Sequence, residues 1–191
     1  NRNANECREN TDDEGVLDDV KNDLLRRNLL AAVVAESGKA DNGKNVEARE
    51  TMLKASYYAG MAFTRAYVGY VHAIAHNLGG FYGIPHGLAN AVILPYVLEY
   101  YGESAHARLA KLAVIAGVKT DGTDKEKAEA FIEAIKQMNK NMNIQDKFDC
   151  IKEEDIPTIV KRALKEGNPL YPVPKIMDAA DCEAVIRRLM K

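Results

Sequence analysis

Apolar residues recur at steps of three and four along most of this chain, which is the spacing of amphipathic helices. A first helix is predicted over residues 16–33, and a second runs from Val46 past Tyr67 with Asn45 as its N-cap. Further helices are predicted around the histidines at 72 and 76 and over residues 88–101, 104–117, 125–139, 153–165 and 178–190. No segment alternates apolar and polar residues as a half-buried strand would. The pattern therefore predicts an all-α fold, a helical bundle of about seven or eight helices.

Two of these helices have unusual compositions. The helix from Val46 carries many small residues, which allow close approach, so we expect it to be deeply buried; they are Ala55, Ser56, Ala59, Gly60, Ala62 and Ala66. Residues 88–101 are apolar on almost every side, which is typical of a helix inside a core. Pro95 is expected to kink that helix or to mark a junction between two helices. The proline-rich stretch 168–174 is predicted to be an extended connector.

Composition narrows the class of protein. The 191 residues are 47% apolar, which is enough for a sizeable core, and the net charge is −2 with both signs mixed. We therefore expect no nucleic-acid partner and no anionic membrane surface. No apolar run reaches the length of a membrane span. Three scattered cysteines, at positions 7, 150 and 182, argue against a disulfide framework and favour a reducing, cytoplasmic setting.

The candidate chemistry lies in a cluster of histidines. The chain has four histidines, and His72, His76 and His86 fall within one short segment. Residues four apart share one helix face, about 6 Å apart along the axis, and the glycine-rich turn 79–85 can bring His86 back to them. This spacing predicts a metal site, or a metal with a proton-carrying neighbour.

Other interpretations of the same residues are possible from spacing alone. A single histidine on an apolar helix is usually structural, and the glycine-rich turn can be a simple connector. A zinc protease helix needs a glutamate directly after its first histidine, where this chain has Ala73. A di-iron bundle needs Glu-x-x-His, but Gly69 and Ala73 stand three residues before His72 and His76. No glycine-rich phosphate loop or dinucleotide fingerprint is present in the sequence.

Three neighbouring segments resemble the C-terminal helical half of the iron-containing (group III) alcohol dehydrogenases. They read Ala-Gly-Met-Ala-Phe at 59–63, Gly-Tyr-Val-His-Ala-Ile-Ala-His-Asn-Leu-Gly-Gly at 69–80, and Ile-Pro-His-Gly-Leu-Ala-Asn at 84–90. The resemblance covers roughly residues 45–191. It implies a dehydroquinate synthase-like architecture in which an N-terminal α/β domain binds NAD(P) and a C-terminal helical domain holds the metal.

The resemblance also implies roles for the three histidines. Family members hold Fe²⁺, sometimes Zn²⁺, with one aspartate and three histidines, and His72 and His86 match two of these ligands. His76 matches a histidine that lies near the metal and substrate and transfers a proton. Phe63, Phe81 and Tyr82 are candidates for an apolar wall near the substrate, although Phe63 fits a core position better.

The chain departs from the family pattern at its beginning. It starts at Asn1 without methionine, and residues 1–5 resemble the loop that follows the helix bearing the other metal ligands. We therefore expect a polar segment at 1–14 and a helical metal-binding domain at 15–191, with the nucleotide-binding domain absent from this chain. The aspartate and third histidine would lie upstream, so this fragment would hold half a metal site.

These expectations lead to a function and to alternatives. The full-length parent is predicted to be an NAD(P)-dependent alcohol dehydrogenase acting on a small alcohol or aldehyde, and a homo-oligomer. The fragment alone is predicted to be inactive and to bind metal weakly. One alternative is an inactive helical interaction module, and another is a zinc polyol dehydrogenase of the glycerol type.

Overall fold

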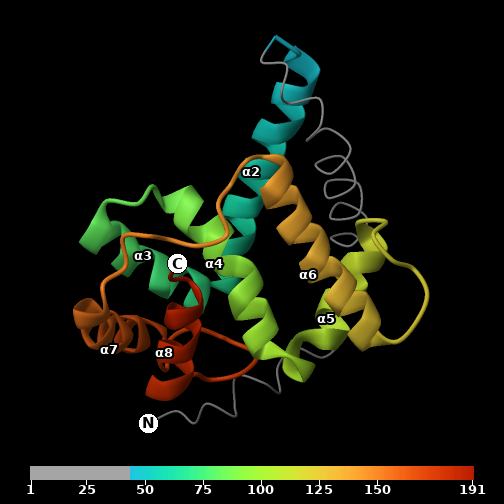
Figure 1. Cartoon of the computed structure of the whole chain (residues 1–191). Coiled ribbons are helices and arrows are strands. Elements are labelled where there is room, and N and C mark those ends of the chain that lie inside the picture. Colours follow the sequence, from blue (N-terminus) through green and yellow to red (C-terminus); the bar gives the residue numbers. More distant parts are fainter. Residues whose placement is uncertain (1–43) are drawn as a thin grey trace. The chain divides into compact units, whose positions relative to one another are not determined.

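The computed structural model describes residues 44–191, which are helical throughout apart from turns and connectors. The all-α prediction is confirmed, with seven α-helices and one short 3-10 helix in this range (Figure 1). The elements are α2 (Val46–Ala66), α3 (Tyr70–Tyr82), α4 (His86–Tyr101), α5 (Glu103–Ile115), α6 (Asp124–Asn141), η1 (Glu153–Asp155), α7 (Ile156–Gly167) and α8 (Ala179–Arg188). The predicted polar segment 1–14 and the helix at 16–33 lie outside the described residues.

Contacts divide the chain into two units, residues 1–59 and residues 60–191. The second unit contains α3 to α8 and the three clustered histidines. None of the helices within residues 44–191 combines the length and apolar composition that a membrane-spanning segment requires.

Helix α2 begins as predicted but is far less buried than predicted. The side-chain oxygen of Asn45 accepts a hydrogen bond from the backbone N–H of Ala48 at 3.1 Å, which makes Asn45 the N-cap. The prediction of deep burial is wrong, because Leu53 is 73% exposed and Tyr57 is 66% exposed. Small side chains permit a close neighbour but do not supply one. The helix ends at Ala66, because the next residue has a positive φ of 59°.

The core of the second unit is built around α3 and α4. Helix α3 packs against both α4 and α7, and α4 also contacts α6 and α8. The prediction that residues 88–101 form a core helix is confirmed, since Val92, Ile93 and Val97 are buried. Burial of this apolar surface is the main favourable term that holds the helices together.

Pro95 lies inside α4 without ending it. Of the two effects expected of Pro95, the helix junction is excluded, because α4 continues from His86 to Tyr101. Proline has no N–H to donate to the carbonyl four residues earlier, which belongs to Ala91. The side-chain amide of Asn139 on α6 donates to that carbonyl at 2.8 Å. A tertiary hydrogen bond thus replaces the missing helical one and ties α4 to α6.

Helices α5 and α6 lie side by side and are joined by the loop of residues 116–123 (Figure 1). Thr123 caps the start of α6: its hydroxyl accepts from the N–H of Glu126, whose carboxylate accepts from the N–H of Thr123 at 2.8 Å. This reciprocal pair is a capping box, which fixes the start of α6.

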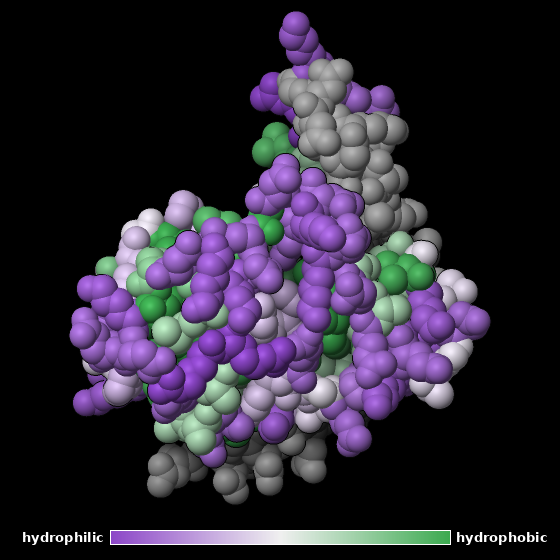
Figure 2. Space-filling view, viewed as in Figure 1, coloured by the Kyte–Doolittle hydropathy of each residue, from purple (hydrophilic) through white to green (hydrophobic). Residues whose placement is uncertain are grey.

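On the face drawn in Figure 2, residues are mostly hydrophilic with smaller apolar areas between them.

The end of α7 is held close to the start of α3. A Cβ atom on Gly167 would lie 2.7 Å from the ring of Tyr70, so only glycine permits this approach. The Tyr70 hydroxyl donates to the side chain of Asn168 and accepts from the backbone N–H of Met177 at 3.0 Å. These contacts anchor both ends of the connector between α7 and α8, and they place the last turn of α7 beside the histidine helix.

Candidate metal and proton-transfer site

The structure brings His72, His76 and His86 together. The ring centroids of His72 and His86 are 5.4 Å apart, those of His76 and His86 are 5.3 Å apart, and those of His72 and His76 are 5.9 Å apart. His72 and His76 lie on α3, and His86 is the first residue of α4. The convergence predicted from the sequence is therefore present.

A tight turn between α3 and α4 produces this convergence. Gly83 follows the last residue of α3 with a left-handed φ of 66°, and its N–H donates to the carbonyl of Gly79 at 2.9 Å. A left-handed residue at this position ends a helix and reverses the chain, and glycine adopts it without strain. Pro85 then sets the start of α4 and presents His86 toward α3.

The spacing of His72 and His86 fits two ligands of one small cation. An imidazole nitrogen bonds Zn²⁺ at about 2.0–2.1 Å, which puts the centroids of two ring ligands about 5 Å apart in a tetrahedral arrangement. The 5.4 Å between His72 and His86 is close to this value, and so is the 5.3 Å between His76 and His86, so the spacing fits either pair. Among residues 44–191, no group of three His, Cys, Asp or Glu side chains is arranged to hold a metal ion. The described part of the chain thus holds no complete set of donors by itself.

The pKa of His72 is lowered from its ordinary value. Burial is the main cause, and the neighbouring His86 and His76 rings add to it. Burial disfavours a charged imidazolium, and nearby cationic rings disfavour it further. The lowered pKa favours the neutral form of the His72 ring, which is the form that can bind a metal.

The side-chain amide of Asn90 lies beside His86, and one of its two polar atoms has no hydrogen-bond partner. The Asn90 side-chain amide donates to the Nε2 atom and to the backbone carbonyl of His86, each at 2.9 Å. The other side-chain atom of Asn90, Oδ1, is buried and has no hydrogen-bond partner. A buried polar atom without a partner is costly, and such atoms commonly bind water or a ligand. This orphaned oxygen beside His86 is consistent with a bound group at the site.

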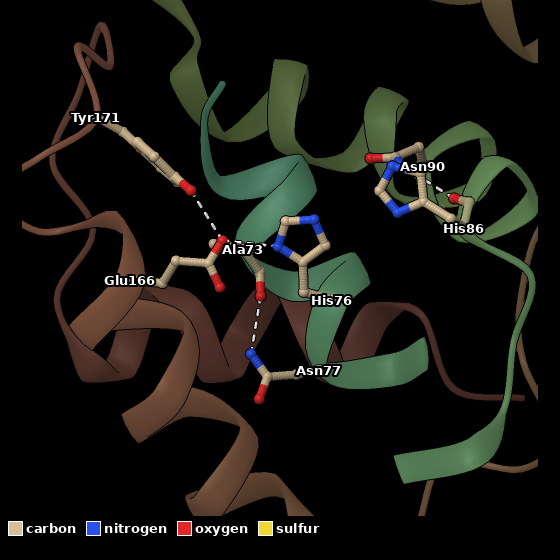
Figure 3. Close-up of polar contacts among 7 residues, drawn as sticks. All are labelled: Ala73, His76, Asn77, His86, Asn90, Glu166 and Tyr171. Atoms are coloured by element: carbon tan, nitrogen blue, oxygen red, sulfur yellow. Dashed lines mark hydrogen bonds and ion pairs between the residues drawn. The ribbon is translucent and has the colours of Figure 1, made fainter. Parts of the chain in front are cut away.

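His76 has a partner on a different helix. Its Nδ1 atom lies 2.7 Å from Oε1 of Glu166, in the last turn of α7, and the Tyr171 hydroxyl donates to the same oxygen at 2.9 Å. Figure 3 shows Glu166 and Tyr171 on one side of the His76 ring, with His86 and Asn90 on the other. The pKa of Tyr171 is raised, first by burial and then by its hydrogen bond to Glu166, so the hydroxyl keeps its proton.

Sequence reasoning missed Glu166, Tyr171 and the contact made by Asn90. Glu166 lies 90 positions after His76, so no local pattern links them. One signal was available: an acidic residue in the last turn of a helix is opposed by the helix dipole, which suggests a partner elsewhere in the fold.

An apolar cavity opens beside His72. Its volume is about 460 Å³, and its lining includes Val71, Leu94, Leu98 and Val173. The aromatic candidates lie elsewhere: Phe63 is 54% exposed, so a core position for it is wrong. Phe81 and Tyr82 are partly buried against the core. The suggested substrate wall remains a prediction.

Comparison with known proteins identifies the family. Residues 21–190 match the model of the C-terminal domain of the Fe-containing alcohol dehydrogenase family. This chain belongs to that family. The match spans most of the sequence and includes the histidine segment, so the resemblance inferred from the motifs is confirmed.

Comparison with individual relatives supports the same family assignment. A 1,3-propanediol dehydrogenase of Citrobacter freundii is 44% identical over 148 residues, which are 76% of this chain and 36% of the relative. Alcohol dehydrogenase 4 of Schizosaccharomyces pombe is 41% identical over 140 residues, covering 69% of this chain and 32% of the relative. The chain thus spans about a third of the length of these relatives.

Solved structures show the same fold. A crystal structure of a 1,3-propanediol oxidoreductase superposes with a TM-score of 0.80 at 35% identity, covering 86% of this chain and 44% of that one. An alcohol dehydrogenase from Oenococcus oeni gives a TM-score of 0.77 at 36% identity, covering 85% of this chain and 44% of that one. The helices described above are therefore the C-terminal domain of the family's architecture.

Proposed function

We propose that residues 15–191 are the helical metal-binding domain of an NAD(P)-dependent alcohol dehydrogenase, which oxidises a small alcohol or reduces the corresponding aldehyde. The observation that carries this proposal is the convergence of His72 and His86, with ring centroids 5.4 Å apart, on one side of a helix–turn–helix. The nucleotide-binding domain and the remaining metal ligands would be supplied from outside the residues of this chain.

His72 and His86 would hold the divalent metal, Fe²⁺ in keeping with the family's description or Zn²⁺ in its place. Because Nε2 of His86 accepts a hydrogen bond from Asn90, this ring would bind through Nδ1 unless Asn90 moves away. When bound, such a metal polarises the alcohol oxygen and lowers the pKa of the hydroxyl. His72 contributes a ring kept neutral by burial. His76 stands next to both rings and would carry the proton released from the substrate, since an imidazole takes up and releases protons near neutral pH.

The substrate is proposed to be a short alcohol or diol. The matched relatives include a 1,3-propanediol dehydrogenase, a lactaldehyde reductase and an NAD-dependent methanol dehydrogenase, all named for small molecules. The apolar cavity beside His72 gives room for a short carbon chain. The free thiols of Cys150 and Cys182 support a cytoplasmic enzyme, and the homo-oligomer expected from the sequence remains part of the proposal.

A chimeric enzyme tests this function. Residues 45–191 would replace the matching segment of the 1,3-propanediol dehydrogenase of Citrobacter freundii, so that the chimera carries a complete nucleotide-binding domain. We expect NAD⁺-dependent oxidation of 1,3-propanediol when Fe²⁺ is added, and at least about a hundredfold loss of kcat/KM in His72→Ala and His86→Ala, as for loss of a metal ligand. The unmodified 191-residue chain is expected to give no turnover.

The fourth histidine supplies the control for this experiment. His106 lies on α5, outside the cluster, so His106→Ala should retain the activity of the chimera. A folded, NAD⁺-binding chimera whose turnover is the same with and without His72 and His86 would contradict the proposed function.

A further inference from the structure

We propose that Glu166 is a positioning residue for His76: its carboxylate holds the proton of that ring on Nδ1 and leaves Nε2 free to accept a proton on the side of the clustered histidines. The inference rests on the proposed function for the role of His76, but the hydrogen-bond geometry that carries it does not.

The first step concerns which atoms can donate. An ionised carboxylate only accepts hydrogen bonds, and Oε1 of Glu166 has two close partners, Nδ1 of His76 at 2.7 Å and the hydroxyl of Tyr171 at 2.9 Å. Nδ1 must therefore carry a hydrogen. In a neutral imidazole the other nitrogen then holds the lone pair.

The second step concerns direction. Figure 3 shows that the Glu166 and Tyr171 side chains approach the Nδ1 side of the His76 ring, while the second ring nitrogen lies on the side of His86. The free lone pair therefore lies on the side of the ring away from Glu166 and Tyr171, the side on which His86 lies. The hydrogen bond fixes both the tautomer and the orientation of the ring, as the outer partners of metal-site histidines commonly do.

The third step is that Glu166 is held in place by features that a simple surface ion pair lacks. Glu166 is in the last turn of α7, where the helix dipole disfavours a negative charge. A glutamate at this position therefore does not stabilise its own helix. The adjacent Gly167 lets α7 approach the ring of Tyr70, which brings this turn against α3. The side chain of Glu166 is 31% exposed, and Tyr171 binds the same oxygen from the connector that follows.

The alternative is an incidental surface pair of little consequence. His76 is 45% exposed in its side chain, and pairs between exposed groups contribute little to stability. An incidental pair would leave the ring free to exchange tautomers and rotamers. The two interpretations therefore differ in the protonation pattern of one ring, which can be measured directly.

Nitrogen-15 NMR of the histidine rings in the metal-free 191-residue chain tests the proposal. Two-bond couplings between ring nitrogens and ring protons, recorded in chelator at a pH where imidazoles are neutral, report which nitrogen carries the hydrogen. The His76 signals would be assigned by their loss in His76→Gln. We expect a single Nδ1–H pattern for His76, and its replacement by the other tautomer or by an averaged pattern in Glu166→Met, which keeps the side-chain length without the carboxylate.

Two further variants sharpen the test. Tyr171→Phe removes only the second donor, so His76 should remain in the Nδ1–H form. Glu133→Met removes a carboxylate from an exposed position of α6 and should leave the His76 pattern unchanged. An Nε2–H or averaged pattern in the wild-type chain, an unchanged pattern in Glu166→Met, or the same change in Glu133→Met would each overturn the proposal.

This measurement needs neither metal nor turnover, so its outcome is separate from that of the proposed function. An unchanged tautomer in Glu166→Met with an active chimera would refute only the role of Glu166. A tautomer that depends on Glu166 in a chimera without metal-dependent activity would refute only the dehydrogenase function.

Discussion

At the scale of single residues, burial determines which groups of this chain keep their protons. The pKa of His72 is lowered chiefly by burial, which favours the neutral form of the ring. Burial has the opposite effect on an acid: it raises the pKa of the Cys182 thiol to about 12. The lowered pKa of His72 favours metal binding at the candidate site. The raised pKa of Cys182 makes this thiol unreactive.

The thiols provide a residue-scale prediction. In a Cys7→Ser variant of the folded chain, an aromatic disulfide reagent near neutral pH should modify the exposed Cys150 rapidly and should reach Cys182 only after denaturation. Cys182 is fully buried and holds almost no thiolate under these conditions. Counting released chromophore with and without urea checks this, and rapid modification of two thiols without urea would contradict the described packing of α8.

The raised pKa of Cys182 also predicts how the stability of the folded chain changes with pH. The folded-state pKa of Cys182 lies above its unfolded value of about 8.5. The unfolded chain therefore loses this proton first, and the contribution of Cys182 to stability falls as pH rises from about 8.5 toward 12.

At the scale of helices, the sequence predicted those features that depend on neighbouring residues. The cap at Asn45 and the apolar helix around Val92 follow from local spacing, and the structure confirms them. The burial of α2 could not be predicted in this way, because it depends on what lies against the helix. The pairing of His76 with Glu166 joins two helices that are far apart in sequence, so only the fold reveals it.

The hydrogen bond from Asn139 to the carbonyl of Ala91 gives an element-scale prediction. Asn139→Ala should lower the free energy of unfolding by about 1–3 kcal/mol, since it leaves a helix carbonyl without a partner. Asn141→Ala, at the exposed end of the same helix, should change it by no more than about 0.5 kcal/mol. Urea denaturation of both variants measures the difference.

A double-mutant cycle tests the role of Pro95 in the same contact. Pro95→Ala restores an N–H that can donate to the carbonyl of Ala91, so Asn139→Ala should cost less in that background than in the wild type. Equal costs in the two backgrounds would mean that Asn139 stabilises the protein in some other way.

At the scale of the whole molecule, the helices of residues 44–191 bring together side chains that are far apart in the sequence. Helices α3, α4 and α7 assemble three imidazoles and a carboxylate within residues 72–166. The sequence motif located the three histidines, because their spacing and the glycine turn are local. It could not show which side chains from distant helices complete their surroundings, and it did not show that α2 would expose large apolar side chains such as Leu53 and Tyr57.

The account depends most on His72 and His86 sharing one divalent ion, and a calorimetric titration of the 191-residue chain with Zn²⁺ tests this directly. We expect one weak site per chain that weakens further as pH falls, because protons compete for the rings. His72→Ala and His86→Ala should each weaken it by more than about tenfold, whereas His106→Ala should not. The account is contradicted if the wild-type chain binds no Zn²⁺, or if it binds Zn²⁺ equally well without either ring.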